Sequence, residues 1–259
     1  TGSTLATEGQ AFWQANKSSM QQLTTVPDRV WKRPSTKSGE GMNHWFHADF
    51  YAPSLSTSDI LKFPKSYRKA IATYGENTIE TKGTAPFRIR QLYNLAVDAF
   101  RAQDMELGLQ YAGTMSHYIG DMSQPLHATD NYDGKDTGND GIHKYFETDV
   151  IGDMLAVQKE VERRARVLLA DPSFQKQFNA DLMDVSFREV GRAVQFRDRI
   201  LDIDNRLGRG QSGAQSQLDL AMDRMADGAA TLAMVLGHLW RDTGRTLRAT
   251  PIPVQDPAW

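Results

Sequence analysis

Residues 117–147 read HYIGDMSQPLHATDNYDGKDTGNDGIHKYFE and contain three of the six histidines of the chain. His117 and Asp121 are four positions apart, and so are His143 and Glu147. Residues with this spacing lie on one face of an α-helix, one turn apart. We therefore predict two helical segments, each of which presents an imidazole and a carboxylate together, as a zinc site requires.

The segment between the two pairs contains a third histidine. Gly120 precedes Asp121 in a helical pattern, where glycine costs roughly 1 kcal/mol relative to alanine. A glycine there indicates close backbone approach or open space. Pro125 ends the helix, so we expect His127 to turn back toward His117. The stretch then offers five nitrogen and oxygen ligands to zinc.

Bulk composition excludes several classes of protein. The chain has 259 residues, of which 40% are hydrophobic and 24% charged, values that are ordinary for a soluble globular protein with a sizeable core. A net charge of −2 argues against binding to nucleic acid or anionic membranes by charge alone. The chain has no cysteine, so any zinc must be bound by His, Asp and Glu. No apolar run reaches the roughly 18 residues of a membrane span.

Hydrophobic periodicity indicates helices along most of the chain. We predict one all-α domain over residues 1–259, with about eight helices that are broken too often for a simple heptad bundle. The aromatic segment 44–52 could form a strand, 33–43 is a predicted loop, and the proline-rich tail from 249 is predicted to be extended. The predicted helices cover 8–24, 58–74 with a break at Pro64, 84–103, 104–122 capped by Asp104, 141–170 with an interruption near Gly152, 183–203 and 214–243.

A calcium loop is a competing interpretation of the acidic part of the stretch. Asp136, Asp140, Gly141 and Glu147 fall at positions 1, 5, 6 and 12 of that pattern. Gly138, however, stands at the third position, where the loop needs Asp or Asn. A flexible surface loop beside the zinc ligands is the simpler alternative.

The phrase HYIGDMSQPLHA resembles the signature of the bacterial zinc-dependent phospholipase C family, a His-Tyr-x-Gly-Asp run followed by Gln-Pro-x-His-Ala. The downstream pair His143 and Glu147 resembles that family's next pair of ligands. TTVPD at 24–28, HWF at 44–46 and LWRDTG at 239–244 extend the likeness over most of the chain.

The resemblance implies an all-α fold of the zinc phospholipase C and zinc nuclease type, with two zinc ions. It also implies that Asp28, near the reactive water, is a general base, and that His47 supports the ligands from behind. His238 matches no ligand of the family, and we predict a structural role for it. The implied ligands are Asp28, His44, His117 and Asp121 for one zinc, and His127, His143 and Glu147 for the other.

The N-terminal region departs from the family. In the family, the N-terminal region binds a third zinc through a terminal Trp and a nearby His, and the residue that matches Asp121 bridges to this zinc. This chain begins with Thr1 and has no histidine before His44, so the third site is in doubt. The first ten residues lack the features of a signal peptide, and we expect a secreted or periplasmic protein whose leader has been removed.

The resemblance implies a phospholipase C that hydrolyses the phosphodiester of glycerophospholipids to diacylglycerol and a phosphorylated headgroup by means of a metal-activated water. The expected partner is phospholipid at a membrane surface, and the expected state is a monomer. Arg29 and Lys32, beside the expected base, predict a headgroup less cationic than choline.

Two alternatives stay open. The related single-strand-specific zinc nucleases share the ligand set, although the short gap from His127 to His143, the use of Glu147 and the absence of cysteine favour the lipase. A non-enzymatic helical domain could instead use zinc for stability or partner binding. Structural zinc sites are usually closed, often with cysteine, whereas seven candidate ligands without cysteine indicate an open, multinuclear site.

Overall fold

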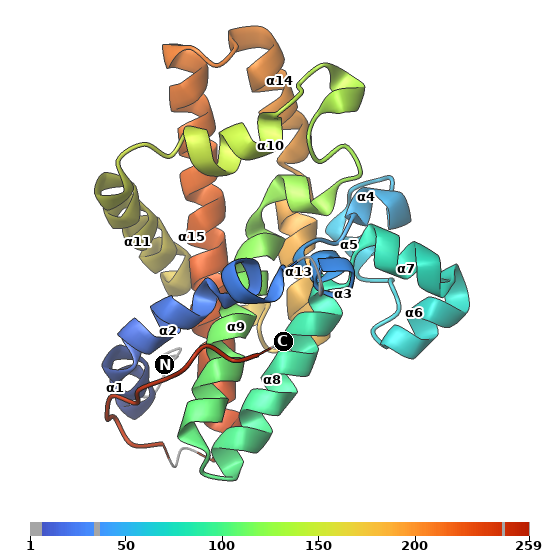
Figure 1. Ribbon diagram of the computed structural model, residues 1–259. Coiled ribbons are helices and arrows are strands. Elements are labelled where there is room, and N and C mark those ends of the chain that lie inside the picture. Colours follow the sequence, from blue (N-terminus) through green and yellow to red (C-terminus); the bar gives the residue numbers. More distant parts are fainter. Residues whose placement is uncertain (1–6, 34–36, 245–246, 259) are drawn as a thin grey trace.

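The computed structural model describes residues 7–33, 37–244 and 247–258, and within these ranges it is helical with no strand. The predicted all-α fold is confirmed (Figure 1). The possible strand over 44–52 is wrong, because this segment forms the 3-10 turn η2 (Met42–His44) and the one-turn helix α4 (Ala48–Tyr51). Its aromatic residues serve the core instead: the ring of Phe46 packs against those of Phe63 and Phe187 at 5.0 and 5.2 Å.

The centre of the molecule is a group of long helices that run close together (Figure 1). Apolar residues on α8 recur at intervals of three and four and become buried against α9, and each large side chain buried in this way contributes about 1.5–3 kcal/mol. The central elements are α2 (Lys17–Thr24), α8 (Ala85–Arg101), α9 (Met105–Ser123), α13 (Leu182–Val194) and α15 (Gln211–Asp242).

The other elements surround this centre. In Figure 1, α6 and α7 project to one side, and α10 and α14 lie at the upper end. These elements are α1 (Thr7–Ala15), η1 (Pro27–Trp31), α3 (Lys37–Gly41), α5 (Thr57–Ile60), α6 (Tyr67–Tyr74), α7 (Glu76–Lys82), η3 (Pro125–Ala128), η4 (Lys135–Thr137), α10 (Ile142–Lys144), η5 (Tyr145–Asp149), α11 (Met154–Ala170), α12 (Pro172–Lys176) and α14 (Arg197–Leu207).

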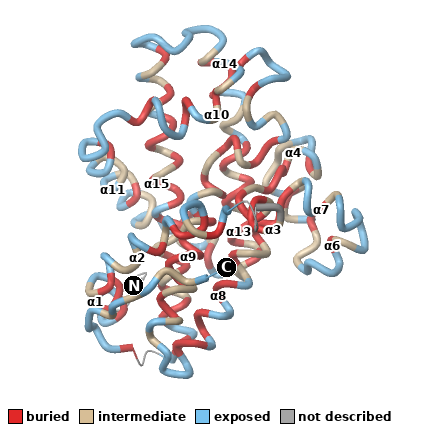
Figure 2. Tube along the Cα trace, in the orientation of Figure 1, coloured by how far each residue is buried: buried red, intermediate tan, exposed pale blue. Residues whose placement is uncertain are grey.

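Buried hydrophobic side chains form two clusters. In Figure 2, many of the buried residues, coloured red, lie along the central helices. The larger cluster lies among α8, α9, α13 and the C-terminal half of α15, while the smaller one includes η5, α14 and the N-terminal half of α15. Leu126 and Ile142 are fully buried in the smaller cluster. They anchor the short segments that carry the neighbouring residues His127 and His143.

Several predicted helices are divided in the structure. Pro64 separates α5 from α6 as predicted, and the interruption near Gly152 is confirmed by a positive φ of 59°. The predicted helix 183–203 is broken after Val194, with no glycine or proline at the break. The expected number of about eight helices is therefore too low, since the described residues form fifteen α-helical segments, several of one turn.

Two glycines of α9 differ in their surroundings. A Cβ on Gly113 would lie 2.4 Å from the Cβ of Leu23, so the glycine permits α2 to pack close to α9. Because η1 follows α2, this contact brings η1 beside the next turn of α9. A Cβ on Gly120 would meet nothing within 4 Å, so of the two explanations for that glycine only open space holds.

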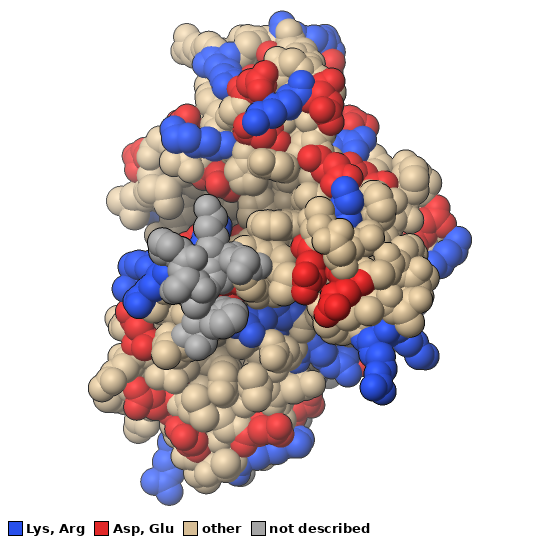
Figure 3. Space-filling model, turned by 45° about the vertical axis from the view of Figure 1, so that its right-hand side comes forward, with Lys and Arg blue, Asp and Glu red and all other residues tan. Residues whose placement is uncertain are grey.

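The surface gives no sign of a single charged face in the view of Figure 3, where acidic and basic side chains are interspersed. Of the helices in the described ranges, none is both long and apolar enough to cross a membrane.

Candidate metal centre

Three predicted ligands from distant parts of the chain meet in a first metal group. Asp28 lies on η1, His44 ends η2 and His117 lies on α9, and their ligand atoms are all within 4.8 Å of one another. The His117 Nε2 atom lies 3.0 Å from His44 Nδ1. The Asp28 carboxylate oxygens lie 3.8 Å from His44 Nδ1 and 3.7 Å from His117 Nε2.

Asp121 adds a fourth candidate ligand, the second carboxylate, to the first group. One turn after His117 on α9, its Oδ2 lies 3.0 Å from His44 Nδ1 and 3.3 Å from His117 Nε2. Its other oxygen, Oδ1, lies 3.4 Å from His127 Nδ1. The helical spacing of His117 and Asp121 thus directs both side chains to the same place, and Asp121 also contacts a residue of the second group.

The second metal group contains His127, His143 and Glu147. The Nε2 atoms of the two histidines are 3.2 Å apart. Glu147 Oε2 lies 3.1 Å from His143 Nε2 and 3.5 Å from His127 Nε2. The predicted four-residue spacing again brings a histidine and a carboxylate together, here from α10 and η5.

Both groups have the donor chemistry and the spacing of a zinc site. Tetrahedral zinc with bonds of about 2.0 Å has ligand atoms about 3.3 Å apart. The contacts of His44, His117 and Asp121 measure 3.0–3.3 Å, and those of the second group 3.1–3.5 Å. The first group has four candidate ligands and the second has three, which leaves the second group a free fourth position.

A buried carboxylate that the sequence interpretation missed lies behind His44. Glu40 is fully buried, and its Oε1 lies 3.2 Å from His44 Nε2, within ion-pair distance. The Tyr118 hydroxyl donates to the same oxygen, and Arg88 lies 3.8 Å from Glu40 Oε2. Glu40 is four positions before His44, a spacing that could have suggested it, but it falls in the predicted loop.

Neighbouring polar atoms orient the ligands of the second metal group. The Nδ1–H of His127 donates to the main-chain oxygen of His44 at 2.7 Å, which leaves its Nε2 free for a metal. Gln124, which caps the end of α9, donates from Nε2 to Glu147 at 3.3 Å. His143 Nδ1 is buried and has no hydrogen-bond partner among the described residues, so its ring is held less firmly than that of His127.

In both groups, contacts between imidazole and carboxylate side chains favour the charged forms and oppose the effect of burial on the pKa. Burial of His44 disfavours its charged form, but hydrogen bonds to Asp121 and Glu40 outweigh this effect and raise the pKa of His44 to about 9. Burial likewise opposes ionisation of Asp121, yet the nearby imidazoles lower the pKa of Asp121. Hydrogen bonds to His127 and His143 lower the pKa of Glu147, again against the effect of burial.

A cavity of about 500 Å³ adjoins both groups, with His44, His127 and His143 in its lining. Lys32, Trp45, Leu126 and Tyr132 form other parts of its wall. The cavity therefore offers a mixed aromatic and cationic surface beside the two groups.

His47 also lies in the wall of this cavity, where it contacts none of the candidate ligands through its ring nitrogens. Its Nδ1 lies 2.6 Å from Asp130 Oδ1, and Lys82 Nζ is 2.8 Å from both oxygens of Asp130. Burial lowers the pKa of His47 in spite of Asp130.

The remaining sequence predictions concern His238, the calcium loop and a third zinc. His238 lines a separate cavity with Tyr93 and Asp242. Glu147, which would be the twelfth position of a calcium loop, faces His143 instead, and the Asn139 side chain is bound to Asp204 at 2.9 Å. The question of a third zinc at Thr1 falls outside the described residues.

Comparison with known proteins gives one similar protein. The chain is 30% identical to a probable serine protease of Bradyrhizobium tropiciagri, over 68% of this chain and 25% of that protein. The chain thus spans about a quarter of the length of this relative. No family model and no solved structure matches the chain.

The function implied by the sequence resemblance is corrected by this comparison. The relative's name indicates a hydrolase of a different kind from a zinc phospholipase C. The single-strand nuclease alternative and the non-enzymatic zinc-binding alternative gain no support from it either.

Proposed function

We propose that the chain is a metal-dependent hydrolase whose reaction centre consists of the two metal groups and the cavity that they share. The observation that carries this proposal is the convergence of seven His, Asp and Glu side chains, from six separate elements, beside a cavity of about 500 Å³ that three of them line. A purely structural zinc site is usually closed by four ligands, whereas the second group has three.

The side chains of this centre would divide the work. When bound, zinc would supply a Lewis acid that lowers the pKa of water toward about 7 and offsets negative charge on the substrate. Asp28, with 56% of its side chain exposed, would accept the proton of an attacking water. Lys32, 3.2 Å from Asp28 and in the cavity wall, would attract an anionic substrate group.

A serine hydrolase is the second candidate, because the relative is named a probable serine protease. His47 and Asp130 form the histidine–carboxylate pair that such a mechanism needs. In the part of the chain that the structure describes, however, no serine hydroxyl makes a hydrogen bond to a histidine ring. Water therefore fits as the nucleophile better than serine.

Metal removal and covalent labelling separate the two candidates. The purified chain would be assayed on casein, p-nitrophenyl acetate, p-nitrophenyl phosphate and bis(p-nitrophenyl) phosphate before and after dialysis against a chelator. We expect hydrolysis of at least one substrate to be lost on dialysis and restored by zinc, and no labelling by a fluorophosphonate. Activity that survives the chelator and is blocked by the fluorophosphonate would instead establish the serine mechanism.

A further inference from the structure

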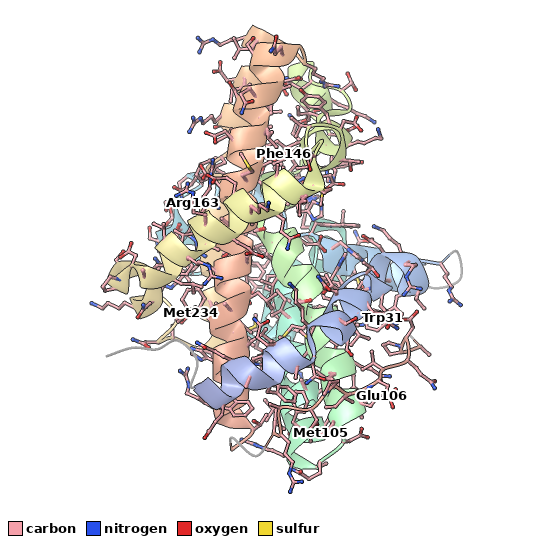
Figure 4. All side chains as sticks on the ribbon, turned by 90° about the vertical axis from the view of Figure 1, so that its left-hand side faces the viewer. Trp31, Met105, Glu106, Phe146, Arg163 and Met234 are labelled. Atoms are coloured by element: carbon pink, nitrogen blue, oxygen red, sulfur yellow. The ribbon has the colours of Figure 1, made fainter. Side chains whose placement is uncertain are left out.

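The segment 250–257, called the strap below, crosses the surface formed by α2, α9 and η1 in an extended conformation, as its prolines predict. Hydrogen bonds fix it along its whole length. Asn16 contacts both Thr250 and Ile252, Ser19 Oγ donates to Ile252 O at 2.8 Å, and Gln110 Nε2 donates to Gln255 O at 3.0 Å. Figure 4 shows the two elements beneath it, with Trp31 on η1 and Glu106 on α9.

The last residues of the strap hold η1 at two residues that follow Asp28. Arg29 Nη2 donates to Asp256 Oδ2 at 2.7 Å, and the Trp31 indole donates to Pro257 O at 2.8 Å. Gln22 on α2 holds the other oxygen of Asp256 at 2.9 Å. Asp28 thus directly precedes Arg29, which Asp256 binds, and it follows α2, where Gln22 binds the same carboxylate.

The turn η1 has little support of its own. It contains five residues and is closed by the Lys32 N to Pro27 O hydrogen bond at 2.9 Å. Short turns of this kind are stabilised mainly by tertiary contacts. The Asp28 carboxylate is 56% exposed and approaches the histidines of its group no closer than 3.7 Å, so its position depends on the backbone of η1.

A second path runs from the strap to His44. The Trp31 ring lies 5.2 Å from the guanidinium of Arg88. Arg88 in turn is 3.8 Å from Glu40, which lies 3.2 Å from His44 Nε2. Two of the four candidate ligands in the first group are therefore supported, directly or through intermediates, by residues that the strap binds.

We propose that the strap is a positioning element for the first metal group and that Asp256 is a positioning residue acting on Asp28 through Arg29. This inference rests on the proposed metal centre. It assigns no chemical step to Asp256, which touches none of the candidate ligands. The strap makes no contact with the second metal group, so the two groups should respond differently when it is weakened.

The test is zinc and Co²⁺ affinity measured separately for each group. A His143→Ala background leaves the first group, and a His117→Ala background leaves the second. In the first background, Asp256→Asn should weaken binding about tenfold, at the lower end of the range for groups that orient metal ligands, and shift the visible absorption of bound Co²⁺. Asp256→Glu, which keeps the charge, should leave the metal affinity of the first group as it is with the unmodified strap.

Two controls make the result specific. Ser19→Ala removes a strap hydrogen bond far from η1 and should leave both affinities unchanged. In the second background, Asp256→Asn should also have no effect. If Asp256→Asn weakened metal binding equally at both groups, or left the metal affinity of the first group unchanged, the positioning role would be refuted. Failure of the unmodified chain to bind zinc at either group would refute the proposed function, and the inference with it.

Discussion

The Nδ1–H of His127 donates to the main-chain oxygen of His44 at 2.7 Å, and the amide of Phe46 donates back to the main-chain oxygen of His127 at 3.0 Å. The backbone that carries a ligand of the first metal group therefore fixes the ring of a ligand in the second. A hydrogen bond at one ring nitrogen determines which nitrogen is free for a metal. The two groups are connected parts of one centre and not independent sites.

Removal of a central ligand should abolish activity without unfolding the protein. In His117→Ala, the first group loses a donor that lies within 3.3 Å of both His44 and Asp121. We expect bound zinc to fall by about one ion per chain and hydrolysis to fall more than about 100-fold. The measurements are metal analysis, the substrate assay and circular dichroism.

His238→Ala is the matched control for this prediction, because His238 lies in a separate cavity beside Asp242. Its metal content and activity should equal those of the unmodified chain. Activity retained in His117→Ala would show that the first group takes no part in the reaction.

Zinc binding should depend on pH through His44. Without metal, hydrogen bonds to Asp121 and Glu40 raise the pKa of His44 from 6.5 to about 9 in spite of burial. The charged ring therefore stabilises the metal-free fold fully below pH 6.5, and this contribution is lost as the pH rises through 9. A metal needs the uncharged ring, so stabilisation by zinc should increase across the same interval.

The measurement for this prediction is the difference in melting temperature with and without zinc at pH 6.5 and pH 9. A larger difference at the higher pH is expected. A difference that does not change would mean that His44 is not a ligand.

The sequence predicts best those site residues whose geometry is local. His117 with Asp121 and His143 with Glu147 are each one helical turn apart, so their spacing alone brings them together. Asp28 and His44 are brought to the site by tertiary packing, and only a resemblance to another family suggested them. Glu40 and Gln124 act behind the ligands: Glu40 has the helical spacing from His44 but falls in a predicted loop, and no spacing rule marks Gln124.

The same distinction applies to the fold. Helices α8 and α9 follow from their apolar periodicity, and the Asp104 cap is confirmed by its bond to Leu107 N at 3.1 Å. The break after Val194 has no local signal, because it depends on how α13 and α14 pack against different cores. The aromatic segment near Phe46 suggested a strand because aromatic residues have a high β-propensity, which does not distinguish a sheet from a buried turn.

The carboxylate behind His44 should control the affinity of the first group. Glu40→Gln keeps the size of the side chain but removes the negative charge 3.2 Å from His44 Nε2. Loss of such a partner typically weakens metal binding on the order of 10- to 100-fold, and we expect a change in this range by competitive chelator titration. Zinc affinity of the second group should be unaffected, and a global loss of stability in thermal unfolding would instead indicate that Glu40 serves only the core.

Two glycines on the same helix should respond oppositely to alanine. In Gly113→Ala the new Cβ would lie 2.4 Å from that of Leu23, so α2 must move away from α9. Overpacking of this kind costs typically about 1–3 kcal/mol, and because α2 leads into η1, the shift should also weaken zinc binding at the first group through Asp28.

Gly120→Ala is the control on the same helix. Its Cβ would meet nothing within 4 Å, so the higher helix propensity of alanine should raise the free energy of unfolding by up to about 1 kcal/mol. Urea unfolding of both variants measures the two effects. Equal effects on unfolding, or normal zinc affinity in a destabilised Gly113→Ala, would show that the close contact of α2 and α9 does not position Asp28.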